Sequence, residues 1–268
     1  MIVSMRLRIL IGVCLSTLLL SAQTPSPGKP VPSTFAVIEE LVTANHILAN
    51  EDVLDGYGHV SVRNPANPNH YFLARAGAPG LVTAADITEY DLDSVATSNA
   101  GATGYTERFI HGEIYKARPD VMAVVHCHCA EVIPFADTGV PLQPMHHMGF
   151  FIGQGVPVFD IKKAAGETDI LIRSPELGKA LAQTLGNSTA VLMRGHGAAI
   201  AAASLHRVVA MSYYLNLNAR LQYQALLLNQ STQAGDRKVT YLDAEESKRA
   251  VQDYERSWDY WKFKLERR

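Results

Sequence analysis

Three histidines have the types and spacing of a metal-binding site. His126 and His128 are separated by one residue within an apolar segment, and His196 lies between two glycines. Side chains on a strand alternate between its two faces, so His126 and His128 would share one face and could bind a single ion. The glycines beside His196 allow a sharp turn of the backbone and the close approach of a ligand. Three neutral imidazoles with a fourth position open are typical of a catalytic zinc site.

Less specific interpretations of the same residues stay open at this point. A His-x-His pair can be two solvated or core histidines, and a histidine after a strand can be an exposed turn residue. Cys127 and Cys129 alternate with the first two histidines, so they would lie on the opposite face of the strand. Because a disulfide between residues two apart on a strand would be strained, we expect these cysteines to be small buried hydrophobic side chains.

Glu107 is the candidate fourth group of the site. It begins a predicted helix, Glu107 to Ala117, which has Thr106 as its expected N-cap and leads into the histidine-bearing strand. A carboxylate in this position could bind the ion at rest and act as a general acid or base once substrate displaces it. Alternatively, Glu107 is an acid in the first helical turn that complements the helix dipole, and position alone favours this interpretation.

Helices and strands alternate along the part of the chain that carries these residues. Apolar spacing and helix-start signals predict helices at 35–49, 107–117 and 205–228, one that starts at Pro175 and one that Asp243 caps. Apolar or alternating runs predict strands at 59–63, 70–75, 89–92, 121–129, 156–160 and 189–194. Strands mixed with helices over one unit predict an α/β sandwich with helices on both faces of the sheet.

The N-terminal residues have the pattern of an export signal. Met1–Ala22 combines Arg6 and Arg8 with an apolar run, Ile9–Leu20, and ends in small residues. The alternative is a membrane anchor, but the run is shorter than the ~20 residues needed to span a bilayer. We therefore predict a cleaved signal at 1–22, a proline-rich linker at 23–33 and one domain at 34–268. The mature protein would be periplasmic or secreted, without membrane association.

Composition and charge exclude several classes of protein. The 268 residues are 47% hydrophobic and 19% charged, which excludes a disordered or collagen-like chain. The 24 basic and 26 acidic residues leave no basic excess to bind a phosphate backbone. We therefore expect a small-molecule substrate and no nucleic-acid partner.

Several motifs occur in an order and spacing that resemble one known family. They are Gly58-His-Val-Ser-Val-Arg63, Leu81-Val-Thr with Asp86-Ile87, Asp91-Leu-Asp93, Glu107, Arg118-Pro-Asp120, Ala123-Val-Val-His126-x-His128 and Gly195-His-Gly197. Together they resemble the class II aldolase/adducin family, from Phe35 to Gln224.

The resemblance implies a three-layer α/β/α sandwich with a mixed central sheet. Such subunits typically form a homotetramer with active sites between subunits. In fuculose-phosphate aldolase-like members, three histidines that hold zinc correspond to His126, His128 and His196, and the catalytic glutamate corresponds to Glu107. All four are present here, whereas the non-catalytic adducin-like branch does not keep the ligands. The expected cofactor is Zn²⁺, with Mn²⁺, Fe²⁺ or Co²⁺ as alternatives.

Other positions depart from the sugar-phosphate aldolase pattern and indicate a different substrate. His59 replaces an asparagine of the first hairpin strand, and Tyr105 and Thr106 replace two serines before the glutamate. A phosphate needs small donors in a concavity, which Tyr105 would fill. Arg75, in the altered loop 74–80, could pair with a substrate carboxylate or be a solvated surface residue. His147 aligns with the family's tyrosine proton donor and could transfer protons, or it packs beside two phenylalanines.

These departures resemble the branch that acts on hydroxylated aromatic acids, including decarboxylases of dihydroxyphthalate type. We predict a metal-dependent carbon–carbon lyase, a decarboxylase or aldolase, acting on a small non-phosphorylated hydroxy or oxo acid through a metal-stabilised enolate. The alternatives are a sugar-phosphate aldolase or epimerase of the same family, and an exported metal- or ligand-binding module without turnover. The predicted catalytic residues are Glu107 and His147, and the predicted substrate-binding residues are His59, Arg75, Tyr105 and Thr106.

Overall fold

A computed structural model describes residues 32–99, 101–231, 238–250 and 253–267. The predicted signal at 1–22 and most of the predicted linker lie outside these residues. The first described helix, α1 (Thr34–Asn50), starts at the predicted boundary of the folded domain. Ser33 is its N-cap, and the Ser33 hydroxyl oxygen accepts a hydrogen bond from the Ala36 N–H at 3.2 Å. This cap explains why the helix begins there, because it satisfies one of the backbone donors of the first turn.

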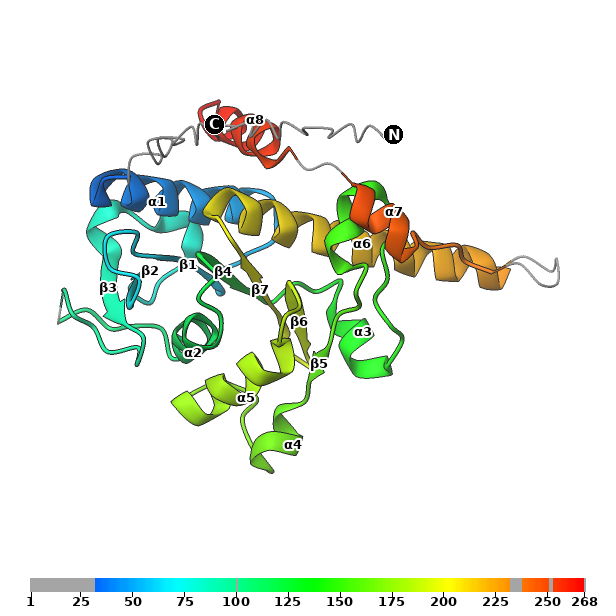
Figure 1. Cartoon of the computed structure of the whole chain (residues 1–268), viewed down its shortest axis with the longest axis horizontal. Helices are drawn as coiled ribbons and strands as arrows, with labels where there is room; N and C mark the ends of the chain where they lie inside the picture. The colour runs from blue at the N-terminus through cyan, green and yellow to red at the C-terminus, as the bar shows by residue number, and fades with distance from the viewer. Residues whose placement is uncertain (1–31, 100, 232–237, 251–252, 268) are drawn as a thin grey trace, which may run out of the picture. The chain divides into compact units, whose positions relative to one another are not determined.

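Within the described residues, seven strands form one mixed sheet in the order β3-β2-β1-β4-β7-β6-β5 (Figure 1). Strands β5 and β6 run parallel, and the other neighbouring pairs run antiparallel. The strands are β1 (His59–Arg63), β2 (His70–Ala74), β3 (Ile87–Asp91), β4 (Ala123–Cys127), β5 (Val158–Phe159), β6 (Ala190–Met193) and β7 (Gly197–Ala202).

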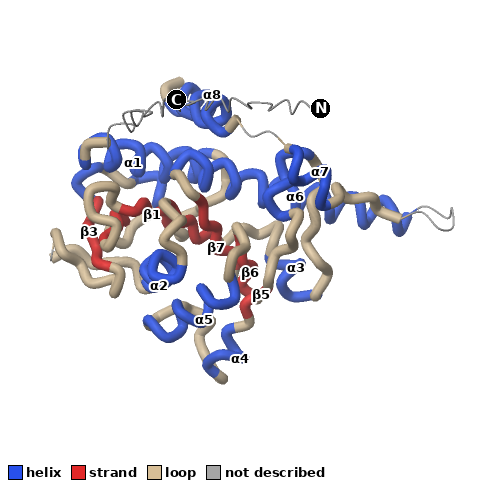
Figure 2. The backbone as a smooth tube through the Cα atoms, viewed as in Figure 1, coloured by secondary structure: helices blue, strands red, loops and turns tan. Residues whose placement is uncertain are grey.

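Helices cover both faces of the sheet, as the layers in Figures 1 and 2 show. One buried apolar cluster joins α1, α6 (Leu205–Ser231) and α8 (Tyr254–Leu265) to one face, through sheet residues such as Val125. A second cluster joins α2 (Phe109–Ala117) and α5 (Pro175–Leu185) to the other face, through residues such as Val124. Neighbouring residues of a strand thus enter opposite cores. This confirms the predicted three-layer α/β/α fold with a mixed sheet.

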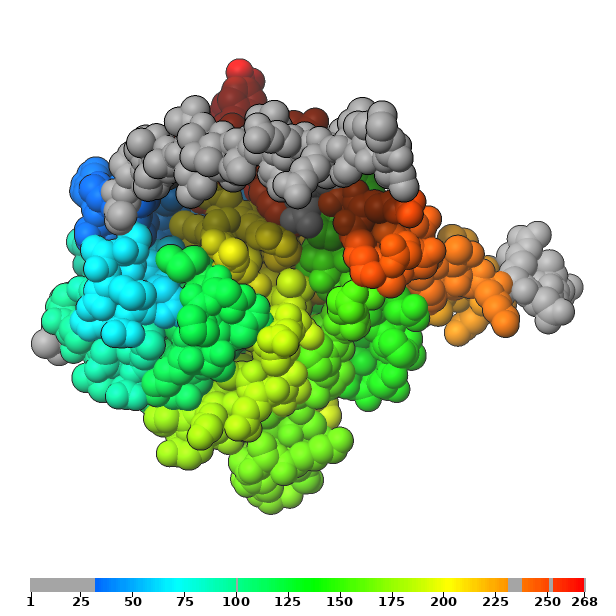
Figure 3. Space-filling model, viewed as in Figure 1, coloured from blue at the N-terminus to red at the C-terminus, as the bar shows by residue number. Residues whose placement is uncertain are grey.

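The helices α4 and α5 form the yellow-green surface at the lower edge of the space-filling view (Figure 3). Helix α4 is one of several shorter helices that complete the described structure. The shorter helices are α3 (Ile133–Thr138), α4 (Ile161–Ala165), α7 (Ala244–Arg249) and the 3₁₀ helices η1 (Pro79–Leu81), η2 (Ala84–Asp86) and η3 (His147–Ile152).

Three central strands bring distant segments to one end of the sheet. His59 is paired with His126 across β1 and β4, and His126 is paired with Ala199 across β4 and β7. Because both pairings are antiparallel, the start of β1, the end of β4 and the start of β7 lie at the same end. Gly197 allows this arrangement, because a Cβ there would overlap the carbonyl oxygen of Cys127.

The structure corrects several predicted elements. Strand β7 was not among the predicted strands, because its Ala-rich sequence lacks the β-branched residues that mark a strand. The predicted cap at Asp243 is confirmed on α7, where Asp243 and Glu246 form a capping box, and a further helix, α8, follows that was not among the predicted helices. The long predicted helix 205–228 continues to Ser231 as α6. Although α6 is long, neither it nor another described helix has the length and apolar character needed to cross a bilayer.

Candidate active site

Four predicted ligand residues meet at the end of the central strands. His128 Nε2 lies 3.2 Å from His196 Nε2, and Glu107 Oε2 lies 3.4 Å from Nε2 of both His126 and His196. One donor atom from each of the four residues lies within 4.8 Å of the others. Donor atoms around a tetrahedral zinc at ~2.0–2.1 Å are ~3.3 Å apart, so the separations of 3.2 and 3.4 Å fit one ion.

Backbone carbonyl groups fix the orientation of two of the imidazoles. His126 Nδ1 hydrogen-bonds the Ala198 carbonyl oxygen at 3.1 Å, and His196 Nδ1 hydrogen-bonds the Ile170 carbonyl oxygen at 3.0 Å. A carbonyl oxygen only accepts, so each Nδ1 carries the proton and each Nε2 lone pair is free. His126 Nε2 is buried and forms no hydrogen bond with the described residues. An unpaired buried acceptor that faces three other donor atoms is the arrangement a metal ion would satisfy.

Glu107 lies outside the helix that it was predicted to begin. Helix α2 starts at Phe109 with Arg108 as its N-cap residue, so Thr106 is not the cap and Glu107 belongs to the preceding turn. Glu107 Oε1 accepts a hydrogen bond from the Ile172 N–H at 2.8 Å, which leaves Oε2 directed at the histidines. Burial raises the pKa of this carboxyl, but the nearby His126 and His196 outweigh burial and hold the pKa well below its usual range.

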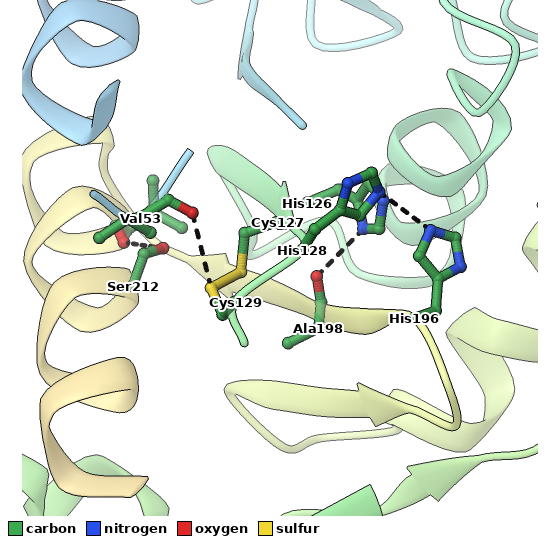
Figure 4. Close-up of a disulfide and its surroundings, with 9 residues drawn as sticks. Val53, His126, Cys127, His128, Cys129, His196, Ala198 and Ser212 are labelled. Carbon is green, nitrogen blue, oxygen red and sulfur yellow. Dashed lines mark hydrogen bonds between the residues drawn. A yellow bond between two sulfur atoms is a disulfide. The ribbon is translucent and has the colours of Figure 1, made fainter. Parts of the chain in front are cut away.

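The two cysteines form a disulfide, so the prediction of two separate hydrophobic side chains is wrong. Strand β4 ends at Cys127, so Cys129 lies outside the strand, and the Cα atoms of the two cysteines lie 5.3 Å apart. Residues two apart in a continuous strand would be separated by about 6.6 Å. The disulfide and the imidazoles project to opposite sides, and His128 lies between the two cysteines in sequence (Figure 4). Both cysteines are buried in the core that contains α6.

A cleft of about 720 Å³ opens beside the four donors. Tyr105 presents its ring to this cleft beside the ring of His59, with 4.5 Å between the ring centroids. The Tyr105 hydroxyl donates to the Gly77 carbonyl oxygen at 2.6 Å, and burial raises the pKa of this phenol to about 12. None of the described lining residues is a lysine or arginine. The lining consists of Gly56, Tyr57, Gly58, His59, Ala76, Gly77, Ala78, Tyr105, Thr106, Glu107, His128 and Leu171.

Two predicted site residues do not line this cleft within the described chain. Arg75 borders a smaller neighbouring cavity of about 190 Å³, where its Nε donates to Asp86 Oδ1 at 2.6 Å. This ion pair engages Nε, and the Arg75 side chain is 52% exposed. His147 is an exposed residue of η3, and its ring contacts His146 with 6.0 Å between the centroids. The predicted substrate-binding residues His59, Tyr105 and Thr106 do line the cleft, together with Glu107.

Further polar residues lie behind the cleft, and the sequence analysis missed them. His111 Nε2 lies 2.6 Å from His59 Nδ1, and His111 Nδ1 lies 2.6 Å from Ser61 Oγ. Ser61 Oγ lies 2.8 Å from the Tyr115 hydroxyl oxygen. The available signals were the spacing of His111 and Tyr115, which share one face of a helix, and of His59 and Ser61, which share one face of a strand.

Comparisons with known proteins agree with the motifs and the fold. A family model described as the Class II Aldolase and Adducin N-terminal domain matches residues 39–223. The decarboxylase tropJ of Talaromyces stipitatus is 36% identical over 244 residues, which cover 84% of this chain and 92% of tropJ. A 3,4-dihydroxyphthalate decarboxylase of Arthrobacter keyseri is 29% identical over 203 residues, with coverage of 69% and 77%.

Solved structures share the fold. An aldolase II superfamily protein from Pseudomonas syringae superposes with a TM-score of 0.72 at 21% identity and covers 89% of this chain and 95% of its own. An L-fuculose 1-phosphate aldolase from Glaciozyma antarctica gives a TM-score of 0.68 at 22% identity, with coverage of 88% and 94%. The resemblance drawn from the motifs is therefore confirmed. This chain belongs to the class II aldolase and adducin N-terminal domain family.

Proposed function

We propose that this protein is a metal-dependent carboxy-lyase that removes carbon dioxide from a small hydroxylated aromatic acid. The observation that carries the proposal is the cluster of three imidazoles and one carboxylate beside a cleft whose described lining residues include no lysine or arginine. Two relatives named as decarboxylases, one of them for 3,4-dihydroxyphthalate, support this choice within the family.

His126, His128 and His196 would hold the metal ion, with Glu107 as the fourth donor in the absence of substrate. Zinc suits three imidazoles and a carboxylate, and Mn²⁺, Fe²⁺ and Co²⁺ are alternatives with the same donor types. A bound divalent ion would supply a Lewis acid that stabilises the negative charge left when the carbon–carbon bond breaks. The carbonyl groups of Ala198 and Ile170 hold two of the imidazoles in the tautomer that binding requires.

The remaining chemistry belongs to residues of the cleft. In the proposed reaction the bond between the substrate carbon and its carboxylate breaks, carbon dioxide leaves, and the electron pair stays on the substrate carbon. A proton then takes the place of the carboxylate, so that atoms and charge balance. Glu107, which is ionised before substrate binds, is proposed to accept the proton of a substrate hydroxyl at Oε2 and to pass it to that carbon, because the Ile172 N–H fixes its other oxygen. Tyr105 would support an aromatic substrate with its ring face.

The cleft favours a carboxylic acid over a phosphorylated sugar. Phosphate sites in proteins use clustered backbone N–H groups, hydroxyls and cations. Here the Tyr105 ring fills part of the cleft, its hydroxyl is already bound to Gly77, and Arg75 is paired with Asp86 outside the cleft. We therefore propose hydroxybenzoate- and dihydroxyphthalate-type acids as the substrate class.

A paired assay tests this proposal. The metal-loaded protein is incubated with dihydroxyphthalate and dihydroxybenzoate acids in one series and with fuculose and ribulose phosphates in the other. Release of carbon dioxide from an acid, with little aldehyde from the phosphosugars, is the expected result. Efficient cleavage of a phosphosugar would place the protein among the sugar-phosphate aldolases, and metal binding without turnover of either class would indicate a binding module.

Assembly and export form a further part of the proposal. Tyr223 and Leu227, on the C-terminal part of α6, are 53% and 46% exposed, which a neighbouring subunit would bury. We propose a homotetramer, which light scattering at micromolar concentration would test. We also propose that residues 1–22 direct export to the periplasm or the medium. The Cys127–Cys129 disulfide supports this, because disulfides persist in oxidising compartments. Fractionation of cells that express the full chain would test it.

A further inference from the structure

Four buried residues form one chain of hydrogen bonds that starts at the cleft. His59 lines the cleft, and its Nδ1 lies 2.6 Å from His111 Nε2. His111 Nδ1 lies 2.6 Å from Ser61 Oγ, which lies 2.8 Å from the Tyr115 hydroxyl oxygen. All four are at most 3% exposed. Only His59 Nε2, which forms no hydrogen bond with the described residues, is left to face the cleft.

Both histidines of this chain are neutral, so each carries one ring proton. Both rings are at most 3% exposed, and among the described residues their hydrogen-bond partners are the neutral groups of this chain, so no carboxylate hydrogen bond stabilises a charged ring. A neutral imidazole has one N–H donor and one acceptor nitrogen, so the chain has a direction. Either the protons point toward the cleft, or they point away from it.

The far end of the chain sets the direction. The Tyr115 O–H needs an acceptor, and Ser61 Oγ is the side-chain acceptor that the described residues offer. Tyr115 therefore donates to Ser61. Within the hydrogen bonds of the described residues, His111 Nδ1 is the acceptor left for the Ser61 O–H, so His111 carries its proton on Nε2 and donates it to His59 Nδ1.

We propose that His111, supported by Ser61 and Tyr115, is a positioning residue that fixes His59 as the Nε2–H tautomer, so that His59 donates a hydrogen bond to a substrate oxygen. The ring of His59 is also held between Tyr105 and His126, with centroids at 4.5 and 5.1 Å. Because the described lining residues include no lysine or arginine, His59 supplies the N–H that recognises a carboxylate or ionised hydroxyl beside the four donors. The identity of that ligand rests on the proposed function.

The tautomer can be measured without any substrate. Zinc-loaded protein labelled with ¹⁵N-histidine would give ring-nitrogen signals, and the set lost in His59→Gln belongs to His59. We expect a protonated Nε2 and a bare Nδ1. In Tyr115→Phe, Ser61 no longer receives the tyrosine proton, so a population with protonated Nδ1 should appear. Tyr71→Phe is the matched control, because Tyr71 is equally buried but its hydroxyl donates to Ser94 outside the chain. A protonated Nδ1 in the unaltered protein would overturn the proposal.

Binding provides the second readout. Dihydroxybenzoate, the acid left when a dihydroxyphthalate loses one carboxylate, serves as the probe. His111→Phe should weaken its binding about tenfold, the scale of one lost hydrogen bond with an unpaired nitrogen left behind. His111→Gln should restore most of the affinity, because its amide N–H can donate to His59 Nδ1. Equal affinity in both variants, with folding confirmed by urea titration, would refute the positioning role. If the native protein showed no decarboxylase activity, the proposed function would fail, but the NMR measurement of the His59 tautomer would still decide the positioning role of His111.

Discussion

Replacing Glu107 by Gln removes the carboxylate charge from the candidate active site while it keeps the shape of the side chain. The amide oxygen can still accept the hydrogen bond from the Ile172 N–H, which spans 2.8 Å in the native protein. The fold should therefore persist. The amide nitrogen would replace Oε2, which lies 3.4 Å from Nε2 of both His126 and His196, and it can neither bind a metal as an anion nor transfer a proton as a carboxyl group.

Two different magnitudes are expected from this substitution. Metal content should change little, because three imidazoles remain. Turnover should fall by about 10²–10⁴, the usual scale for a lost general acid or base, which corresponds to about 3–5 kcal/mol of activation free energy. The loss should appear in kcat more than in KM, because the proton is needed in the transition state.

The assay compares carbon dioxide release from a dihydroxyphthalate-type acid with metal content measured on the same samples. Glu113→Gln is the matched control. Glu113 is a buried carboxylate on α2 whose partner is Lys116, with 2.5 Å between Oε1 and Nζ, and it does not line the cleft. It should retain wild-type turnover. Full turnover in Glu107→Gln at unchanged metal content would refute the assigned role and leave Glu107 as a structural acceptor for Ile172.

Three further outcomes are expected. His128→Ala should lose most of the bound metal, whereas His70→Ala, at the start of β2, should keep it; elemental analysis that finds equal occupancy would show that the ligand assignment is wrong. Replacing both Cys127 and Cys129 by Ala should lower the free energy of unfolding by about 1–2 kcal/mol, the loop-entropy scale for so short a loop, and an unchanged urea midpoint would contradict this. The folded-state pKa of His111 is about 3, below the unfolded value, so the unfolded state binds a proton first as pH falls. The contribution of His111 to the free energy of unfolding should therefore be fully present above about pH 6.5 and should decrease toward pH 3. A urea series in which His111→Gln showed the same pH dependence as the native protein would contradict this.

The candidate metal donors could be predicted from sequence because residues close in the sequence, or held by a glycine turn, stay close in the structure. His126 and His128 flank one residue at a strand end, and Gly197 permits the contact that brings His196 to them. Glu107 required the family resemblance, since position alone suggested a helix-start acid. The structure shows instead that it lies before α2 and is oriented by the Ile172 N–H.

The disulfide, strand β7 and the Arg75–Asp86 ion pair could not be predicted, because the sequence does not show where the strands end or which surface residues meet. Strand periodicity continued through Cys129, whereas β4 ends at Cys127, and that early end brings the two sulfurs together. Strand β7 is rich in alanine, so burial in the sheet rather than intrinsic propensity makes it a strand. The pairing of Arg75 with Asp86 joins the residue after β2 to the last residue of η2 and could not be read from composition.

The most direct test of the central claim is carbon dioxide release by the full chain during chelation and metal titration. We expect the native protein to release carbon dioxide from a dihydroxyphthalate-type acid in proportion to the product formed. This activity should be lost when a chelator removes the metal, and it should return as one ion per chain is restored. His128→Ala should remain inactive at the same metal concentration. Metal-independent release of carbon dioxide, or equal release by His128→Ala, would contradict the assignment of the reaction to this site.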